Sequence, residues 1–139
     1  MTRHVRSIPM ALAIAVLALM TSAAMAQSYT GKWPATVTKS QRDNGKNCIT
    51  LTDDRSYGFR HSGEAVLNGQ NNGYPGYFTV VHGLMTVTFT FPSGAGDCCD
   101  FAVFTAPASD GHIGKGVFNY FGLTDIGVVN FGKKNGCTV

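Results

Sequence analysis

Apolar and polar side chains alternate most clearly over residues 84–91, near the middle of the chain. Met85, Val87, Phe89 and Phe91 occupy every second position there, and the positions between them are mainly threonine. Successive side chains of a strand point to opposite faces, so this pattern predicts a half-buried strand with its aromatic face inward. Similar, shorter segments occur at residues 33–39, 48–52, 64–67, 77–82, 101–106, 115–121 and 128–131, which makes about eight strands.

Turn-forming residues separate these segments. They fall at residues 44–45, 53–55, 68–69 with 72–73, 82–83, 92–94, 110–111 and 122–125, and most are Asn-Gly, Asp-Gly or His-Gly pairs typical of tight connections. Short strands joined by short turns predict an all-β fold, an antiparallel meander of about eight short strands forming a closed or partly open up-and-down barrel. A β-sandwich is the alternative. Pro34 cannot donate to a ladder, so the first strand either starts at this proline or has an unpaired edge there.

The first 26 residues have the pattern of a cleaved signal peptide. Arg3 and Arg6 precede an apolar segment at residues 8–20, and small residues at 24–26 predict cleavage before Gln27. The alternative is an uncleaved membrane anchor, because the apolar region nearly reaches the roughly 20 residues that span a bilayer. We therefore expect a bacterial protein that is periplasmic or secreted.

The domain division follows from this cleavage: 1–26 is the signal peptide and 27–139 is a single β domain. All 17 glycines and all the aromatic residues lie in the second part, a composition typical of strands and tight turns. Its charge is nearly balanced and includes no run of like charges, so nucleic acid is not an expected partner. Several segments fall short of the roughly 9–11 residues of a membrane-spanning strand, so no membrane insertion is expected after cleavage.

Four cysteines, Cys48, Cys98, Cys99 and Cys137, predict structural disulfides in an exported domain. Cys48 pairs with Cys98 or Cys99 if the start of the second strand and the turn after the fifth lie at the same end, and Cys137 then reaches the remaining cysteine through a folded-back tail. Otherwise Cys48 pairs with Cys137 and the neighbouring pair is left over. The functional alternative is a redox or soft-metal site at Cys98 and Cys99, although the string lacks the usual two-residue gap.

The remaining polar candidates favour structural roles. His61, His82 and His112 each lie beside glycine or serine, where we expect a turn or strand end and a solvated ring. Asp53 and Asp54 are interpreted as turn formers. The sequence has no Gly-x-Ser-x-Gly elbow and no His-Glu-x-x-His motif, so we expect no catalytic residue, no metal and no cofactor.

The glycine-rich string at residues 111–116 superficially resembles a phosphate loop. Lys115 is not followed by serine or threonine, and no helix is predicted after it. The string is therefore interpreted as a turn entering a glycine-rich strand, where glycine permits close packing or a bend.

Gly31-Lys32-Trp33 opens the first predicted strand and resembles the Gly-x-Trp signature of calycin-like β-barrels, which include lipocalins, avidin-type proteins and small periplasmic protease inhibitors. The resemblance implies that Trp33 plugs one end of the barrel. It also implies that a basic residue after the last strand, Lys133 or Lys134, packs across the indole. Pro34 departs from the pattern, directly after the tryptophan.

These features predict an exported, small β-barrel-like binding protein that is not an enzyme and whose ligand is unknown. The candidate contacts are Asn71, Asn72, Tyr74 and Tyr77, because tyrosine and asparagine combine apolar area with hydrogen bonding. The alternative is an extracytoplasmic protein-partner module, such as a protease inhibitor or an envelope interaction protein. A redox or metal site at the neighbouring cysteines is the third class.

Overall fold

The computed structural model describes residues 28–41, 44–68, 73–91, 101–121 and 125–138. This part of the chain contains nine strands and no helix, and therefore no helix that could cross a membrane. The strands are β1 (Gly31–Thr38), β2 (Gly45–Tyr57), β3 (Arg60–Asn68), β4 (Tyr74–Val81), β5 (Leu84–Thr90), β6 (Phe101–Ser109), β7 (His112–Ile113), β8 (Lys115–Phe121) and β9 (Asp125–Phe131).

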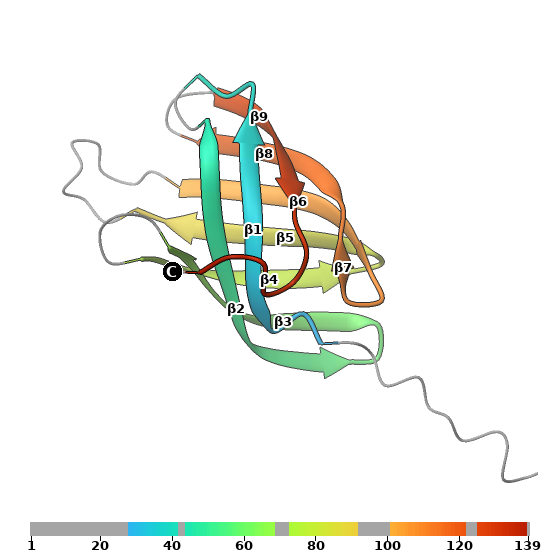
Figure 1. Cartoon of the computed structure of the whole chain (residues 1–139). Coiled ribbons are helices and arrows are strands. Elements are labelled where there is room, and N and C mark those ends of the chain that lie inside the picture. The colour runs from blue at the N-terminus through green and yellow to red at the C-terminus, as the bar shows by residue number, and fades with distance from the viewer. Residues whose placement is uncertain (1–27, 42–43, 69–72, 92–100, 122–124, 139) are drawn as a thin grey trace, which may run out of the picture.

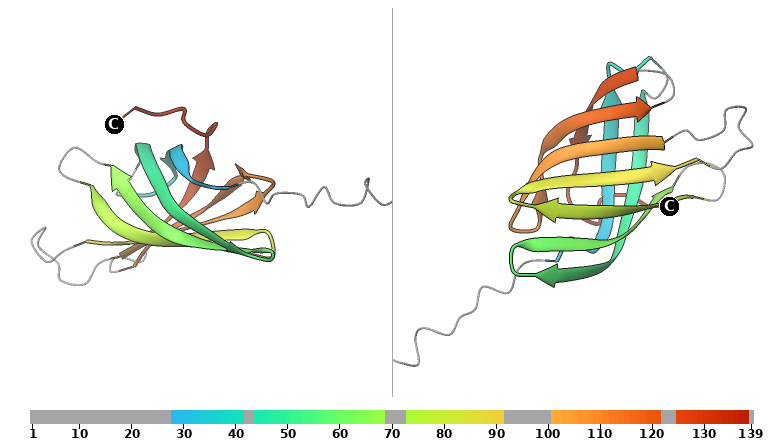
Figure 2. Two further views of the ribbon diagram at one scale, coloured as in Figure 1. Left: turned by 90° about the horizontal axis from the view of Figure 1, so that it is seen from below. Right: turned by 180° about the vertical axis from the view of Figure 1, so that it is seen from behind.

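Eight of these strands form a closed antiparallel barrel (Figure 1 and Figure 2). The ring runs from β1 through β6 in sequence order, continues through β8 and β9, and closes where β9 pairs with β1. The two-residue strand β7 pairs only with the end of β6, outside the ring. The predicted all-β meander barrel is confirmed, and the sandwich alternative is wrong because one sheet closes on itself. Closure also removes exposed sheet edges.

Aromatic side chains fill the barrel interior. The largest of the fully buried side chains are Trp33, Phe78, Phe89, Phe104 and Phe118, and the rings of Phe104 and Phe118 lie 5.0 Å apart. The alternation predicted at residues 84–91 is confirmed, since the apolar face of β5 is buried and Phe91 packs against the same core. An eight-stranded barrel is just wide enough for its own side chains.

The turn predicted at residues 53–55 is wrong. β2 continues to Tyr57, and its register with β3 shifts between Thr52 and Arg55, which is a β-bulge. Asp53 takes the left-handed conformation there, with φ 51°. Opposite the bulge, a Cβ on Gly63 would lie 2.3 Å from the Thr52 carbonyl oxygen, so only glycine fits.

Two-residue turns connect several strands at one end of the barrel. Tyr57 pairs with Arg60 across the β2–β3 turn, whose first residue, Gly58, has φ 60°. The turns predicted at residues 82–83 and 110–111 are confirmed, and both of their residues have positive φ, as the type I′ hairpin requires.

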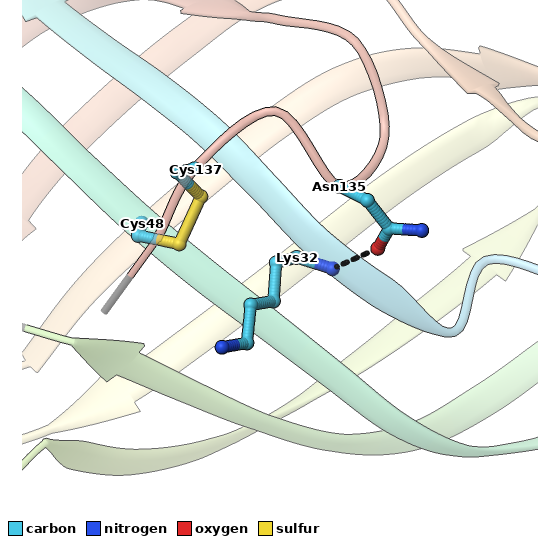
Figure 3. The surroundings of a disulfide bond; sticks show 4 residues. All are labelled: Lys32, Cys48, Asn135 and Cys137. Carbon is cyan, nitrogen blue, oxygen red and sulfur yellow. Dashed lines mark hydrogen bonds between the residues drawn. A yellow bond between two sulfur atoms is a disulfide. The ribbon is translucent and has the colours of Figure 1, made fainter.

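The C-terminal tail occupies part of the edge of β1. The Lys32 N–H donates to Asn135 Oδ1 over 3.1 Å (Figure 3). The Lys32 carbonyl accepts from the Asn135 N–H over 2.6 Å. The Pro34 carbonyl accepts from the Gly132 N–H over 2.7 Å. β1 therefore starts before the proline, and the missing N–H of Pro34 faces the tail, because the N–H and C=O of a strand residue point to the same side.

A disulfide joins Cys48 to Cys137, with 5.9 Å between their Cα atoms (Figure 3). Figure 1 shows the tail passing from the end of β9 across β1 toward β2, the strand that carries Cys48. Of the pairings that the sequence left open, this is the one in which neither Cys98 nor Cys99 pairs with Cys48 or Cys137. Cys98 and Cys99 lie outside the described residues. Such a bond is compatible with an oxidising, extracytoplasmic location.

Candidate functional site

A buried, hydrogen-bonded cluster of polar groups lies at the end of the barrel that carries the β2–β3, β4–β5 and β6–β7 turns, on the right in Figure 1. We call this the turn end and define it by residues 57–60, 81–84 and 109–112. Tyr29, which leads into β1, is buried there. The Ala108 N–H donates to the Gly83 carbonyl over 2.8 Å and so ties the β4–β5 turn to β6. Tight turns and this cross-connection make the turn end rigid.

The Asp54 carboxylate joins Tyr29 and His61 at the turn end. Its Oδ2 accepts from the Tyr29 N–H over 2.6 Å, and its Oδ1 lies 2.9 Å from His61 Nδ1. The side chains of His61 and Asp54 are only 8% and 2% exposed. Two expectations are therefore corrected: Asp54 is a buried hydrogen-bond acceptor because the bulge breaks the strand's alternation, and the His61 ring is not solvated.

Tyr29 connects this pair to the core. Its carbonyl accepts from the Trp33 indole N–H over 2.9 Å, and its ring meets the His61 ring edge-on with centroids 5.0 Å apart. Burial raises the pKa of the Tyr29 hydroxyl above its ordinary value. The backbone amide of Gly111 opposes this rise in pKa, and the carboxylates of Asp110 and Asp54 add to it. Tyr29 is thus held neutral between two acidic groups.

The outer nitrogen of His61 faces a small hollow. No partner for Nε2 is present among the described residues, yet these residues leave no fully buried side-chain nitrogen or oxygen unpaired. Nε2 therefore reaches the hollow that His61 lines, whose volume is about 230 Å³. Tyr29, Phe59, Val80, Ala108 and Asp110 are among the other residues that line it.

Exposed apolar side chains occur at the turn end, and one of them, Phe59, lines this hollow. Tyr57 is 87% and Phe59 63% exposed on the β2–β3 hairpin, and Val81 and Leu84 are exposed beside the β4–β5 turn. The Phe59 ring lies against the His82 ring with centroids 4.8 Å apart. His82 in the β4–β5 turn and His112 at the start of β7 are both exposed, as predicted for a turn or strand end. The turn end therefore combines an apolar rim with a polar hollow.

Two further hollows lie on the outer wall of the barrel. One, of about 250 Å³, is lined by Asp53 and Tyr77 among others, and one of about 410 Å³ lies beside the disulfide. The charged side chains that line them are all exposed. Neither hollow has a buried ionisable pair such as the one at the turn end.

Tyr74 and Tyr77, two of the residues proposed from the sequence as ligand contacts, do not share a face. Tyr74 is partly buried, and its ring meets the Phe91 ring edge-on at 4.6 Å. Tyr77 is 59% exposed on the outer wall, because three positions along a strand reverse the direction of the side chain. Asn71 and Asn72 lie outside the described residues. Contact of these four residues with a ligand stays a prediction.

Lys134 connects the segment after β9 to the residues at the start of β1. Its side chain lies against the space where a Cβ of Gly31 would be, and its Nζ donates to the Ser28 carbonyl over 2.9 Å. Trp33, 2% exposed, is in the core. The contacts of Lys134 lie beside the start of β1, and packing of Lys133 or Lys134 across the indole stays a prediction.

A second buried carboxylate, Asp125, is structural. It accepts from the Ser40 hydroxyl and, over 2.9 Å, from the Gln41 N–H, and so anchors the chain after β1 to the start of β9. Within the described ranges, no three His, Cys, Asp or Glu side chains are grouped as they are around a metal ion.

Comparison with protein-family models, with curated proteins and with solved structures gave no match. The geometry of the turn end is therefore the basis for a function.

Proposed function

We propose that this protein is an extracytoplasmic, non-catalytic binding protein whose ligand is another protein, docked on the turn end. The observation that carries this proposal is the exposed aromatic pair of the tight β2–β3 hairpin, Tyr57 and Phe59, of which Phe59 lines the hollow. The barrel acts as the scaffold that holds them. The signal-like N-terminus and the Cys48–Cys137 disulfide support an exported protein.

The aromatic residues favour a macromolecular contact. Tyrosine and phenylalanine are enriched at protein–protein interfaces, where they supply large contact areas at low entropy cost. Here Phe59 lies in a two-residue turn and Tyr57 ends the strand before it, so little conformational freedom remains to be lost on binding. Contiguous exposed apolar groups on a soluble domain often mark such a site.

The size of the hollow favours a protein partner over a small ligand. Pockets for small molecules have volumes of about 300–1,000 Å³, whereas the hollow at the turn end measures about 230 Å³. Inside the barrel, buried aliphatic and aromatic side chains occupy the inward-facing positions of the described strands. A single side chain from a partner fits the hollow, and the surrounding rim supplies the remaining area.

The test is affinity capture with the immobilised mature protein from the extracytoplasmic fraction of the producing organism. Replacing Tyr57→Ser together with Phe59→Ser should abolish retention of the specific partner without lowering the melting temperature, because both side chains are exposed. The matched control is Val117→Ser with Ile126→Ser, two exposed apolar residues on the wall of β8 and β9.

The control variant should retain the partner as well as the unmodified protein does. Equal retention by both double variants would overturn the turn end as the docking surface. Loss in the control variant alone would assign binding to the wall of β8 and β9 instead.

A further inference from the structure

We infer that the hollow at the turn end receives the cationic head of a lysine or arginine side chain from the partner. This inference rests on the proposed function, because it assigns the chemistry of the group that enters the site. It depends on three features of the hollow: a histidine held in one orientation, a carboxylate with no basic side chain beside it in the lining, and apolar walls with an aromatic rim.

The histidine presents an acceptor. When the ring is neutral with its proton on Nδ1, this N–H donates to Asp54 Oδ1 over 2.9 Å. Nε2 then carries a lone pair toward the hollow. The Asp54 carboxylate, 2% exposed behind the ring, keeps this orientation by bonding the Tyr29 N–H as well. A buried, oriented acceptor of this kind fits a group that only donates hydrogen bonds, such as ammonium or guanidinium.

The second acceptor is Asp110. It is exposed, lines the hollow and lies on the β6–β7 turn with φ 48°. Among the described residues that line the hollow there is no lysine or arginine to neutralise it. Arg60, the first residue of β3, directly precedes the buried His61, so strand alternation directs it to the outer wall. The hollow is therefore negative and rich in acceptors.

The apolar walls of the hollow suit the methylene stem of a lysine or arginine side chain. Val80 and Ala108 offer apolar contact for a methylene stem, and long basic side chains bury their stems while keeping the charged head polar. The exposed ring of Phe59 is available for a cation–π contact at the entrance. Apolar walls, an aromatic rim and two acceptors together match lysine or arginine better than an acidic or neutral side chain.

The experiment is an NMR titration of the isotope-labelled mature protein with Nα-acetyl-lysinamide and Nα-acetyl-argininamide. Nα-acetyl-norleucinamide, which has the stem without the charge, is the matched control probe. The cationic probes should shift the His61 ring signals and the Asp110 and Gly111 amide signals, with saturation. The uncharged probe should leave them unchanged at the same concentration.

The variant pair is Asp110→Asn and Asp53→Asn. Both aspartates are exposed with positive φ, a conformation that asparagine tolerates, but Asp53 lines a different hollow. Asp110→Asn should raise the lysinamide and argininamide dissociation constants about twofold to fivefold. Asp53→Asn should leave both constants unchanged.

Three outcomes would overturn the inference: equal shifts with the norleucine probe, equal weakening by both variants, or shifts confined to other residues. Saturable shifts of the same signals with Zn²⁺ but not with the amines would also overturn it, in favour of a metal ligand. Failure of this inference is separable from failure of the proposed function. If Tyr57→Ser with Phe59→Ser abolishes partner capture and Asp110→Asn does not, docking at the turn end stands and the cationic side chain is rejected.

Discussion

At the residue scale, two adjacent aspartates have opposite environments. Asp53 is exposed on the outer wall, whereas the carboxylate of Asp54 lies inside the barrel end and bonds Tyr29 and His61. The sequence shows only two acidic residues in a row, which resemble a turn. The bulge between Thr52 and Arg55 decides which of them is buried. One carboxylate therefore supports the candidate site and its neighbour does not.

Asp54→Asn should lower the free energy of unfolding by about 2–4 kcal/mol, because it removes charge-assisted bonds from two buried partners. Asp53→Asn is the matched control and should change that free energy by less than about 0.5 kcal/mol. Urea denaturation followed by fluorescence measures both. Equal effects of the two substitutions would mean that the Asp54 contacts do not stabilise the fold.

At the element scale, neighbouring strands approach one another closely at some of their glycines. A Cβ on Gly116 in β8 would lie 2.0 Å from the Thr105 carbonyl oxygen of β6 and 2.6 Å from Ala106 Cβ. The glycine-rich string at residues 111–116 is thus a type I′ turn, the short strand β7 and the start of β8. Close packing, which was one of the two roles expected for these glycines, is confirmed at Gly116.

Gly116→Ala should reduce the free energy of unfolding by more than about 2 kcal/mol, since the carbonyl and methyl groups it meets belong to the backbone or to a rigid side chain. Gly45→Ala is the control, because nothing lies within 4 Å of its Cβ position. That substitution should be neutral or stabilise by up to about 1 kcal/mol through the unfolded chain. Comparable midpoints of thermal unfolding for the two variants would contradict the close approach.

At the scale of the whole molecule, the tail connects the end of the chain to its first two strands. β9 pairs with only the second half of β1, from Ala35 to Thr38. The tail bonds Lys32 and Pro34 in the first half, and the disulfide holds it to β2. Ring closure is therefore completed by an irregular segment.

Replacing Cys48→Ser and Cys137→Ser together should lower the free energy of unfolding by about 2–5 kcal/mol, because the bond closes a loop with a sequence separation of 89 residues. Hydrogen exchange at the Lys32 and Asn135 amides should accelerate more than exchange in β5. The control is Lys46→Ser with Thr138→Ser, exposed neighbours on the same two segments. A loss below about 1 kcal/mol, or uniform acceleration of exchange, would contradict a role for the bond in fastening the tail.

Local patterns predicted most of the fold. Alternation identified β5 and the segments that became β1, β3, β4, β6, β8 and β9, because a strand with one buried face repeats every two residues. His-Gly and Asp-Gly identified two hairpin turns, because these residues tolerate positive φ. β2 was predicted too short, since an aspartate pair at a bulge has the same composition as a turn.

The sequence by itself determined the class of the fold, the alternation of its core and its tightest turns, since each depends on residues a few positions apart. The tertiary structure decided which cysteine Cys48 meets, which aspartate is buried and where Tyr29, His61 and Asp110 come together. The residues that meet are separated by 25 positions or more along the chain, except for Asp54 and His61, which face each other across the β2–β3 hairpin. Their proximity follows from strand register and ring closure, which depend on how the whole sheet packs around its aromatic core.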